Sequence, residues 1–188
     1  MPTCIAGIDW SIAGPSICIH PKDMAWDLSN CKFLTIDNVK KNQGFWFNDK
    51  IEVLSPIKVY SYDIERFSII ADKFITFLNK NNCEFALFEA YAYGGSGKVF
   101  NLAESTGLMK HALTTNNISW SGETPPVFKK YATGKGNSNK DIMHDFFVKD
   151  TGVDFIKMFN QTKLKSPADN LVDSYFICKY QHEQTYCV

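Results

Sequence analysis

The sequence predicts a mixed α/β fold in which helices flank a sheet of five strands. Two observations carry this prediction. Two short extended segments joined by Gly14-Pro15 open the chain, and a third extended segment follows them. From residue 63 onward, helical and extended patterns alternate. An antiparallel meander followed by alternating helices and strands gives a mixed sheet, antiparallel in its first three strands and parallel after them.

The meander is the first part of this pattern. Residues 4–8 are rich in strand formers, and an extended pattern resumes at 16–20 after the tight connection, which indicates a β-hairpin. Residues 32–39 alternate well enough to predict a third strand. Residues 40–60 have mixed character, and we expect an insertion or a long loop with some extended structure there.

Helical periodicity is clearest from Asp63 to Asn79, where apolar residues recur at the spacing of one helix face. A buried strand is predicted over 83–90. The remaining predicted elements are a helix over 98–115, a strand over 117–120, a short helix after Pro125-Pro126, and helices over 138–149 and 167–182. We find no internal repeat and no linker, so we expect residues 1–188 to form one domain.

The composition is that of a folded protein. Apolar residues make up 45% of the chain and aromatic residues 14%, which excludes a disordered chain. No apolar run approaches the roughly 18 to 20 residues of a membrane helix, and the N-terminus lacks the basic start of a signal peptide. We therefore expect no membrane association and a cytoplasmic location, in a bacterium or in a host cell infected by a phage or virus.

The net charge is formally zero, but the charges are unevenly spread. Residues 1–97 carry nine basic and eleven acidic residues, residues 98–165 carry ten and six, and residues 166–188 carry one and three. A neutral total is compatible with nucleic-acid binding if the positive part forms one face.

Two other kinds of site are not supported by their motifs. The six cysteines show neither CxxC pairing nor histidines at zinc-ligand spacing, so we expect free thiols and no zinc. The loop that ends in Gly97-Lys98 is similar to a phosphate-binding loop, but Ala92 and Val99 stand where that motif needs Gly and Ser or Thr. We expect no nucleotide cofactor.

Four acidic residues interrupt apolar structure. Asp9 ends the first strand, Glu89 ends the strand over 83–90, and Asp169 and Asp173 lie one turn apart on the last helix. Burying a carboxylate costs several kcal/mol unless it is paired or bound to a metal. Carboxylates suit Mg²⁺ or Mn²⁺, and two such ions about 3.5 to 4 Å apart can clamp a phosphoryl displacement. Each acid alone also fits a solvated cap or surface residue, but their joint order favours a metal site.

These acids lie in segments that resemble the three acidic motifs of RuvC-type Holliday junction resolvases, in the RNase H-like and retroviral integrase nuclease superfamily. The segments are Gly7-Ile8-Asp9-Trp10-Ser11, Leu87-Phe88-Glu89-Ala90 and residues 168–175. Residues 98–107 and 133–140 are similar to the family's helix after the Glu strand and to its Gly/Lys segment. The resemblance spans nearly the whole chain and is weakest over 21–60, which we expect to be a family-variable insertion. Trp10 stands where many relatives have a small residue or Pro.

The resemblance implies an RNase H-like fold and a homodimer that nicks four-way DNA junctions with two Mg²⁺ ions per active site, which Mn²⁺ could replace. It implies that Asp9 bridges the ions, that Glu89 binds one, and that Asp173 or Asp169 completes the shell and orients the attacking water. The family spaces its last two acids three residues apart, and Asn170 occupies that position here. Whether Asp169 or Asn170 fills the fourth place is left open.

Basic and polar residues between the second and third acidic motifs are expected to contact DNA. This set comprises Lys98, Asn101, Lys110, Lys129, Lys130, Lys135 and Lys140. Each phosphate that a lysine neutralises adds affinity through counterion release. Lys135 and Lys140 are favoured within the set, because the surrounding Gly, Asn and Ser residues expose backbone donors to phosphate.

Other functions remain open at this stage. The same chemistry would serve a less selective flap or replication-fork nuclease. A catalytically inactive junction-binding module is a further alternative, although an unused acidic cluster would only repel phosphate. An actin-like ATPase or sugar kinase would need a second homologous half, for which 188 residues leave no room.

Overall fold

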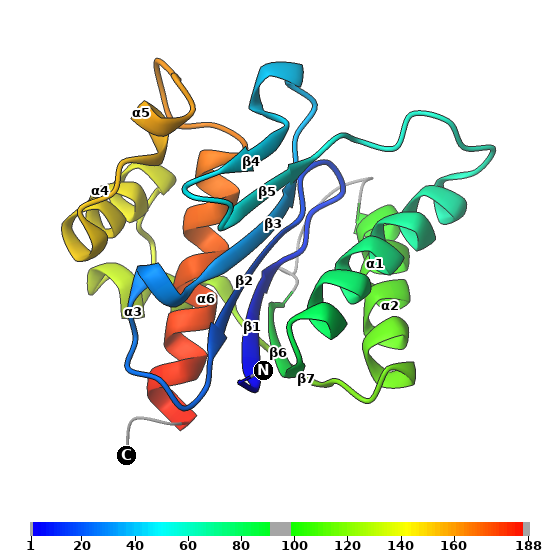
Figure 1. Ribbon diagram of the computed structural model, residues 1–188, viewed down its shortest axis with the longest axis horizontal. Helices are drawn as coiled ribbons and strands as arrows, with labels where there is room; N and C mark the ends of the chain where they lie inside the picture. Colours follow the sequence, from blue (N-terminus) through cyan, green and yellow to red (C-terminus); the bar gives the residue numbers. More distant parts are fainter. Residues whose placement is uncertain (1, 91–98, 186–188) are drawn as a thin grey trace.

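A seven-stranded mixed sheet runs through the computed structural model, which describes residues 2–90 and 99–185 (Figure 1). The strand order is β4-β5-β3-β2-β1-β6-β7. The strands are β1 (Cys4–Asp9), β2 (Ser16–Pro21), β3 (Lys32–Ile36), β4 (Gly44–Trp46), β5 (Ile51–Leu54), β6 (Cys83–Glu89) and β7 (Ser119–Glu123). β1, β2 and β3 pair antiparallel, whereas β6 pairs parallel with β1 and β7 parallel with β6. The predicted mixed sheet is confirmed.

The predicted number of five strands is too low, because the extended structure expected within residues 40–60 forms two strands, β4 and β5, that join the sheet. β5 pairs parallel with β3, and β4 pairs antiparallel with β5 at the sheet edge. The turn between them consists of Phe47, Asn48 and Asp49, all with positive φ. Asn48 and Asp49 tolerate this conformation and are typical of turns, so the sequence carries a turn signal here, and only Phe47 is an unusual residue at positive φ.

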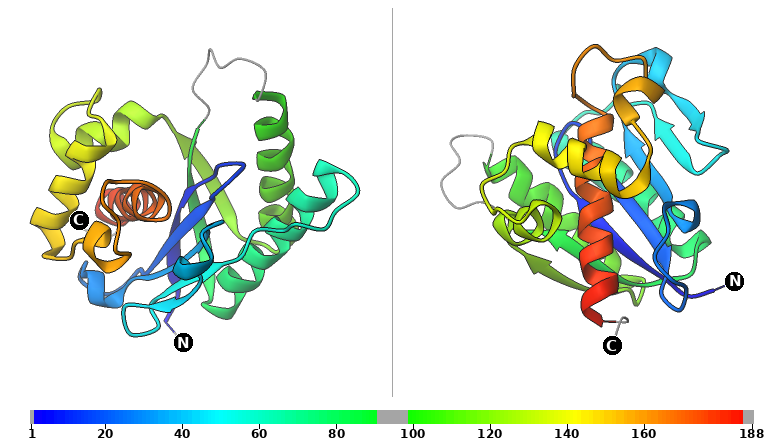
Figure 2. Two further views of the ribbon diagram at one scale, coloured as in Figure 1. Left: turned by 90° about the horizontal axis from the view of Figure 1, so that it is seen from above. Right: turned by 90° about the vertical axis from the view of Figure 1, so that its left-hand side faces the viewer.

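Helices cover both faces of the sheet (Figure 2). α1 (Asp63–Lys80) and α2 (Val99–Thr115) lie on one face, and α3 (Pro125–Thr133), α4 (Lys140–Thr151), α5 (Phe155–Met158) and α6 (Ala168–Thr185) on the other. Single 3₁₀ turns occur at η1 (Leu28–Asn30) and η2 (Lys40–Asn42). The helices predicted from periodicity are present with ends shifted by a few residues, and β7 begins two residues later than predicted. None of the described helices is long and apolar enough to span a bilayer.

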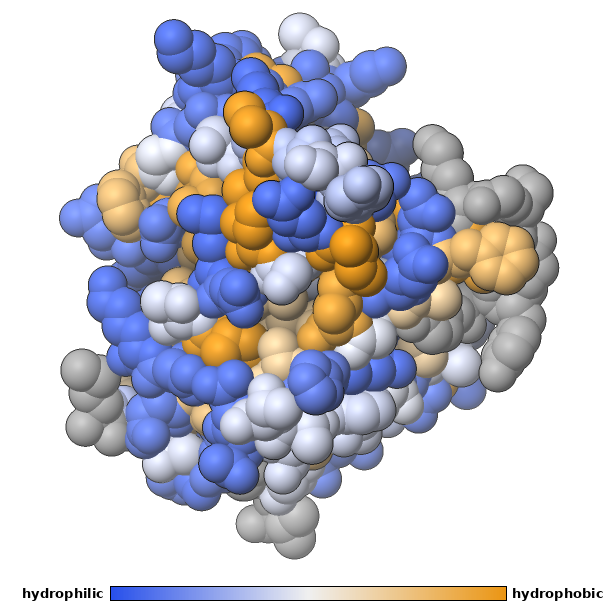
Figure 3. Space-filling model, turned by 90° about the vertical axis from the view of Figure 1, so that its right-hand side faces the viewer, coloured by the Kyte–Doolittle hydropathy of each residue, from blue (hydrophilic) through white to orange (hydrophobic). Residues whose placement is uncertain are grey.

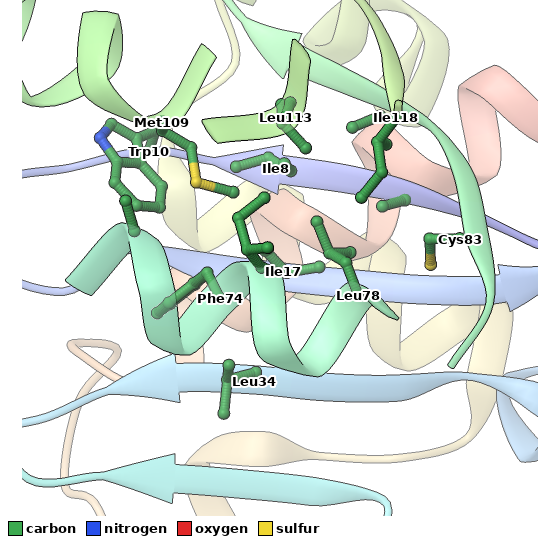
Figure 4. Packing of buried hydrophobic residues seen from close by; sticks show 14 of the residues in the cluster. Ile8, Trp10, Ile17, Leu34, Phe74, Leu78, Cys83, Met109, Leu113 and Ile118 are labelled. Atoms are coloured by element: carbon green, nitrogen blue, oxygen red, sulfur yellow. The ribbon is translucent and has the colours of Figure 1, made fainter. Parts of the chain in front are cut away.

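The period-two alternation of the central strands divides the core into two clusters. Ile8 and Ile17 point toward α1 and α2, where they join Phe74 in one buried cluster (Figure 4). Ile5 and Cys18 point to the opposite face and join the cluster beneath α6. Since successive side chains of a strand point to opposite faces, each central strand contributes to both clusters.

α6 lies unusually close to β1 where it crosses Gly7. A Cβ atom at Gly7 would lie 2.6 Å from the Cα of Cys178 and 2.7 Å from the carbonyl oxygen of Ser174, and closer still to the Cys178 nitrogen. Beside this crossing, the hydroxyl oxygens of Ser16 and Ser174 are 3.0 Å apart. The absence of a side chain at Gly7 therefore allows α6 to lie this close to the sheet, and the Ser16–Ser174 contact sets its register.

Gly7→Ala is expected to lower the free energy of unfolding by about 2 kcal/mol or more, because the new methyl group would overlap the α6 backbone. Gly107→Ala on α2 is the matched control, since a Cβ there has no neighbour within 4 Å. Alanine favours a helix interior over glycine, so the control is expected to gain about 0.5 to 1 kcal/mol. Urea denaturation measures both, and equal stability of the two variants would contradict the close contact.

Candidate active site

Two of the four acids lie at the same edge of the sheet. Asp9 is the last residue of β1 and Glu89 the last residue of β6. The two strands are parallel neighbours, with Ile8 opposite Phe88. Both carboxylates therefore leave the sheet side by side at the carboxyl ends of their strands.

α6 brings the third acid to this edge. Asp173 directly precedes Ser174, whose hydroxyl contacts that of Ser16. Ser16 is in turn the β2 partner of Asp9 in the antiparallel pair. Ser174 also donates to the carbonyl of Leu171 at 3.0 Å, which leaves the Ser16 hydroxyl as the donor between the two serines. This chain of contacts places Asp173 beside Asp9.

Lys140 supplies the nearest positive charge. Its ammonium group lies 2.8 Å from Oδ2 of Asp169 and 3.5 Å from Oδ2 of Asp173. Lys140 begins α4, and the preceding Asn139 caps that helix by accepting a hydrogen bond from the Ile142 nitrogen. The first residue of α4 thus places its ammonium group near the carboxylates of Asp169 and Asp173, one turn apart on α6.

A small cavity of about 90 Å³ opens next to these groups. It is lined by Glu89, Lys129, Lys140 and Asp173 together with the apolar residues Pro125, Phe128, Met143 and Ile177. Two acids and two lysines therefore face a space whose other walls are apolar.

The acids raise one another's proton affinity. Burial, followed by repulsion from Asp173 and Glu89, holds the pKa of Asp9 well above its usual range. Burial and Asp173 raise the pKa of Glu89 to about 7. Burial also raises the pKa of Asp173, with Lys140 acting in the opposite direction and Asp169 in the same direction. The site carries more negative charge than its surroundings compensate.

Within residues 2–90 and 99–185, no three His, Cys, Asp or Glu side chains stand in an arrangement that would hold a metal ion. The chemistry of the donors fits Mg²⁺ or Mn²⁺, because Asp9, Glu89 and Asp173 offer the carboxylate oxygens that hard divalent cations prefer. Burial first, and then the neighbouring carboxylates, raise the pKa values of Asp9 and Glu89, and a bound cation would offset both effects.

Asp169 and Asn170, between which the sequence did not decide, point to different places. The Asn170 amide is buried and donates to the Gly14 carbonyl at 2.8 Å and to the Ser166 hydroxyl at 3.3 Å. Asp169 instead meets Lys140. The structure therefore brings Asp169 to the acidic cluster and uses Asn170 to hold α6 against the β1–β2 connection.

Trp10, the bulky residue of the first acidic motif, belongs to the core. It is buried, meets the Phe74 ring edge to face, and donates from Nε1 to the Ser105 hydroxyl at 3.0 Å. The indole thus ties the end of β1 to α2. Ser105 and Ser174 lie inside the segments 98–107 and 168–175, and Ser16 on the second strand, but the sequence does not single out these serines because their roles depend on contacts between distant segments.

The residues expected to contact DNA are dispersed. Lys129 and Lys140 line the cavity beside the acids, whereas Lys98 lies outside the described residues. Lys110 places its ammonium 4.8 Å from the Trp120 ring, and Trp120 pairs with the middle of β6 and so lies away from the acidic edge.

The other three members of that set lie at helix ends. Asn101 is in the first turn of α2 and donates to Asp63 at 3.3 Å, which joins the starts of α1 and α2. Lys130 and Lys135 are exposed near the end of α3. Among the described members of the set, Lys129 and Lys140 are thus the two that line the cavity.

The fold is similar to that of proteins of known structure. No family model and no curated protein matches the sequence. A structure of Thermus thermophilus RuvC matches with a TM-score of 0.59 and 13% identity, over 96% of this chain and 95% of that chain. T. thermophilus RuvC in complex with Holliday junction substrate matches with a TM-score of 0.65 and 13% identity, over 97% and 96%. The predicted RNase H-like fold of RuvC is thereby confirmed.

The raised pKa of Glu89 predicts a pH-dependent stability. Its folded-state pKa of about 7 exceeds the ordinary value of 4.5. The folded protein therefore keeps a proton that the unfolded chain has released between these values, and stability falls as the pH rises through this window. In EDTA, the Tm of the wild type is expected to fall between about pH 5 and pH 8, and Glu89→Gln to flatten that fall.

Glu84→Gln is the control, because Glu84 is exposed on the same strand and pairs with Lys22. Thermal melting of the three proteins across this pH range is the measurement. If Tm falls with pH equally in Glu89→Gln and the wild type, the raised pKa of Glu89 is contradicted.

Proposed function

We propose that this chain is a RuvC-type nuclease that hydrolyses phosphodiester bonds in branched DNA, with the four-way junction as its substrate. The observation that carries the proposal is the convergence of Asp9, Glu89 and Asp173 at one edge of a RuvC-like sheet. T. thermophilus RuvC, whose structure is similar, has been solved with Holliday junction substrate. The fold and the acids support the same chemistry independently.

Asp9, Glu89 and Asp173, with Asp169 at the rim, would hold Mg²⁺ or Mn²⁺, two ions per site. Bound divalent cations would supply Lewis-acid stabilisation of the phosphate and lower the pKa of water. The ends of β1 and β6 bring Asp9 and Glu89 to one edge of the sheet, and the Ser16–Ser174 contact brings the segment of α6 that carries Asp173 to the same edge. Asp173 or Asp169 then orients the attacking water.

Lys140 and Lys129 would contact the DNA backbone beside the scissile bond. About half of the Lys140 side chain is exposed, at 54%, although its ammonium pairs with Asp169. Burial alone would lower the pKa of this ammonium, but Asp173 and Asp169 more than offset that effect and raise it. Lys140 thus remains charged and can exchange a carboxylate for a phosphate.

Paired incision of a junction needs two active sites, which we propose a homodimer provides. Figure 3 views the side of the molecule formed by α1 and α2, where apolar atoms interrupt the polar surface. Exposed apolar side chains gather where these two helices begin: Val59, Tyr62, Ile64, Val99 and Phe100. The contact from Asn101 to Asp63 joins the two helix starts. Exposed apolar patches of this kind are typical of protein interfaces.

Asp9→Asn is expected to abolish cleavage while preserving or improving junction binding, because it removes negative charge that repels phosphate. The assay uses labelled four-way junction, Y-fork and linear duplex with Mg²⁺, Mn²⁺ or EDTA, and an electrophoretic shift in EDTA measures binding. Asp23→Asn, at an exposed acid on the β2–η1 connection, is the control.

Paired symmetric nicks in the junction alone would establish a resolvase. Cutting of forks or flaps as well would make the chain a broader branched-DNA nuclease with the same site. Absence of metal-dependent cutting of all three substrates would overturn the nuclease and favour an inactive binding module, and undiminished cutting by Asp9→Asn would remove Asp9 from the mechanism.

Asp169→Asn and Asn170→Ala are expected to separate catalysis from stability. Asp169→Asn should reduce the cleavage rate by about tenfold or more with little change in Tm, because its carboxylate faces Lys140 and the acids. Asn170→Ala should lower the free energy of unfolding by about 1 to 3 kcal/mol, because the Gly14 carbonyl loses a buried partner. Single-turnover cleavage and urea denaturation are the measurements, and the reverse pattern would assign the fourth position to Asn170.

A further inference from the structure

A second groove lies away from the acidic cluster. Its volume is about 530 Å³, and it runs between α1 and the strands β3, β5 and β4. Lys32 at the start of β3 pairs with Ile19, whereas Thr35 near the end of β3 pairs with Ser16, the partner of Asp9. Lys32 therefore lies at the end of the sheet opposite the acids.

Four lysines line the groove: Lys32, Lys50, Lys73 and Lys80. In the described part of the chain, none of them lies within 4.0 Å of a carboxylate oxygen. Lys32 donates to the neutral side chain of Asn81 at 2.9 Å. Asp49 and Glu52 also line the groove, so cations outnumber acids two to one. A concave surface with an excess of cations attracts a polyanion.

The rim of the groove carries an aromatic side chain that is held outward. Phe45 on the edge strand β4 is 64% exposed. The adjoining turn keeps three successive non-glycine residues at positive φ, beginning with Phe47. Such a costly conformation persists only where its surroundings hold it in place, and it is common at ligand sites. Trp46 secures the strand by donating to the Asn42 carbonyl at 2.7 Å.

We propose that this groove is a second nucleic-acid site that binds a single strand, with its lysines on successive phosphates and Phe45 stacked on an unpaired base. Positive grooves with aromatic platforms bind single strands in this way. An apolar protein segment fits less well, because its docking would bury four ammonium groups without partners. The choice of nucleic acid over other polyanions rests on the proposed function.

Lys73→Gln/Lys80→Gln tests the phosphate contacts. Both side chains are exposed on α1, and glutamine keeps the helix propensity. The matched control is Lys40→Gln/Lys41→Gln, two exposed lysines of η2 outside the groove. Binding of a fluorescein-labelled thymidine oligonucleotide of about 12 nucleotides is measured by anisotropy in EDTA at several salt concentrations.

The groove variant is expected to bind several-fold more weakly, with the slope of log K against log salt reduced by about 1.4, or roughly 0.7 for each lost phosphate contact. The control is expected to keep the wild-type slope. Equal slopes for the groove variant and the control would overturn the proposal. Phe45→Ala is expected to lose about fivefold or more in affinity at an unchanged slope, and unaltered affinity would overturn the stacking contact.

These outcomes are separable from the nuclease proposal, because binding in EDTA does not depend on cleavage. The wild type could fail to cut branched DNA while the groove variant still shows the reduced slope of log K against log salt. That result would refute the proposed nuclease and support the proposed groove site. If the wild type cuts branched DNA and the groove variant binds with the same slope as the control, the nuclease proposal is supported and the groove proposal is refuted.

Discussion

The close approach of α6 to β1 is the contact on which the candidate active site depends. Gly7 leaves room for the helix backbone, and the hydroxyls of Ser16 and Ser174 set the register of the helix along the strand. That register places Asp173 close enough to Asp9 to act on it electrostatically. The bond from Asn170 to the Gly14 carbonyl holds the beginning of the same helix. One packing contact therefore contributes both to the stability of the core and to the assembly of the acids.

The assembled acids weaken the fold that holds them. Burial and mutual repulsion raise the proton affinity of Asp9, Glu89 and Asp173, and Lys140 offsets only part of the charge. Sites that perform electrostatic catalysis commonly concentrate charge in this way, at a cost in stability. A divalent cation at the carboxylates would relieve the repulsion and stabilise the folded state by mass action. Binding of metal and folding are then coupled through the same side chains.

The sequence was sufficient for features that depend on local pattern. Two short apolar runs rich in strand formers placed Asp9 and Glu89 at strand ends, and the order of elements predicted the fold. Spacing could not separate Asp169 from Asn170, because residues three and four positions before Asp173 share its helix face; a contact with Gly14, distant in sequence, separates them. The groove was missed because its lysines lie in the half of the chain with net negative charge and come together only when β3, β5 and α1 pack.

The central claim is that the carboxylates of β1, β6 and α6 form one site for divalent cations. Crystals grown with Mn²⁺ and measured at a wavelength where manganese scatters anomalously test it most directly. We expect anomalous density in contact with the carboxylates of Asp9, Glu89 and Asp173, and movement of the Lys140 ammonium away from Asp173. Saturating Mn²⁺ without density at these carboxylates, and with the Lys140 pair unchanged, would contradict it.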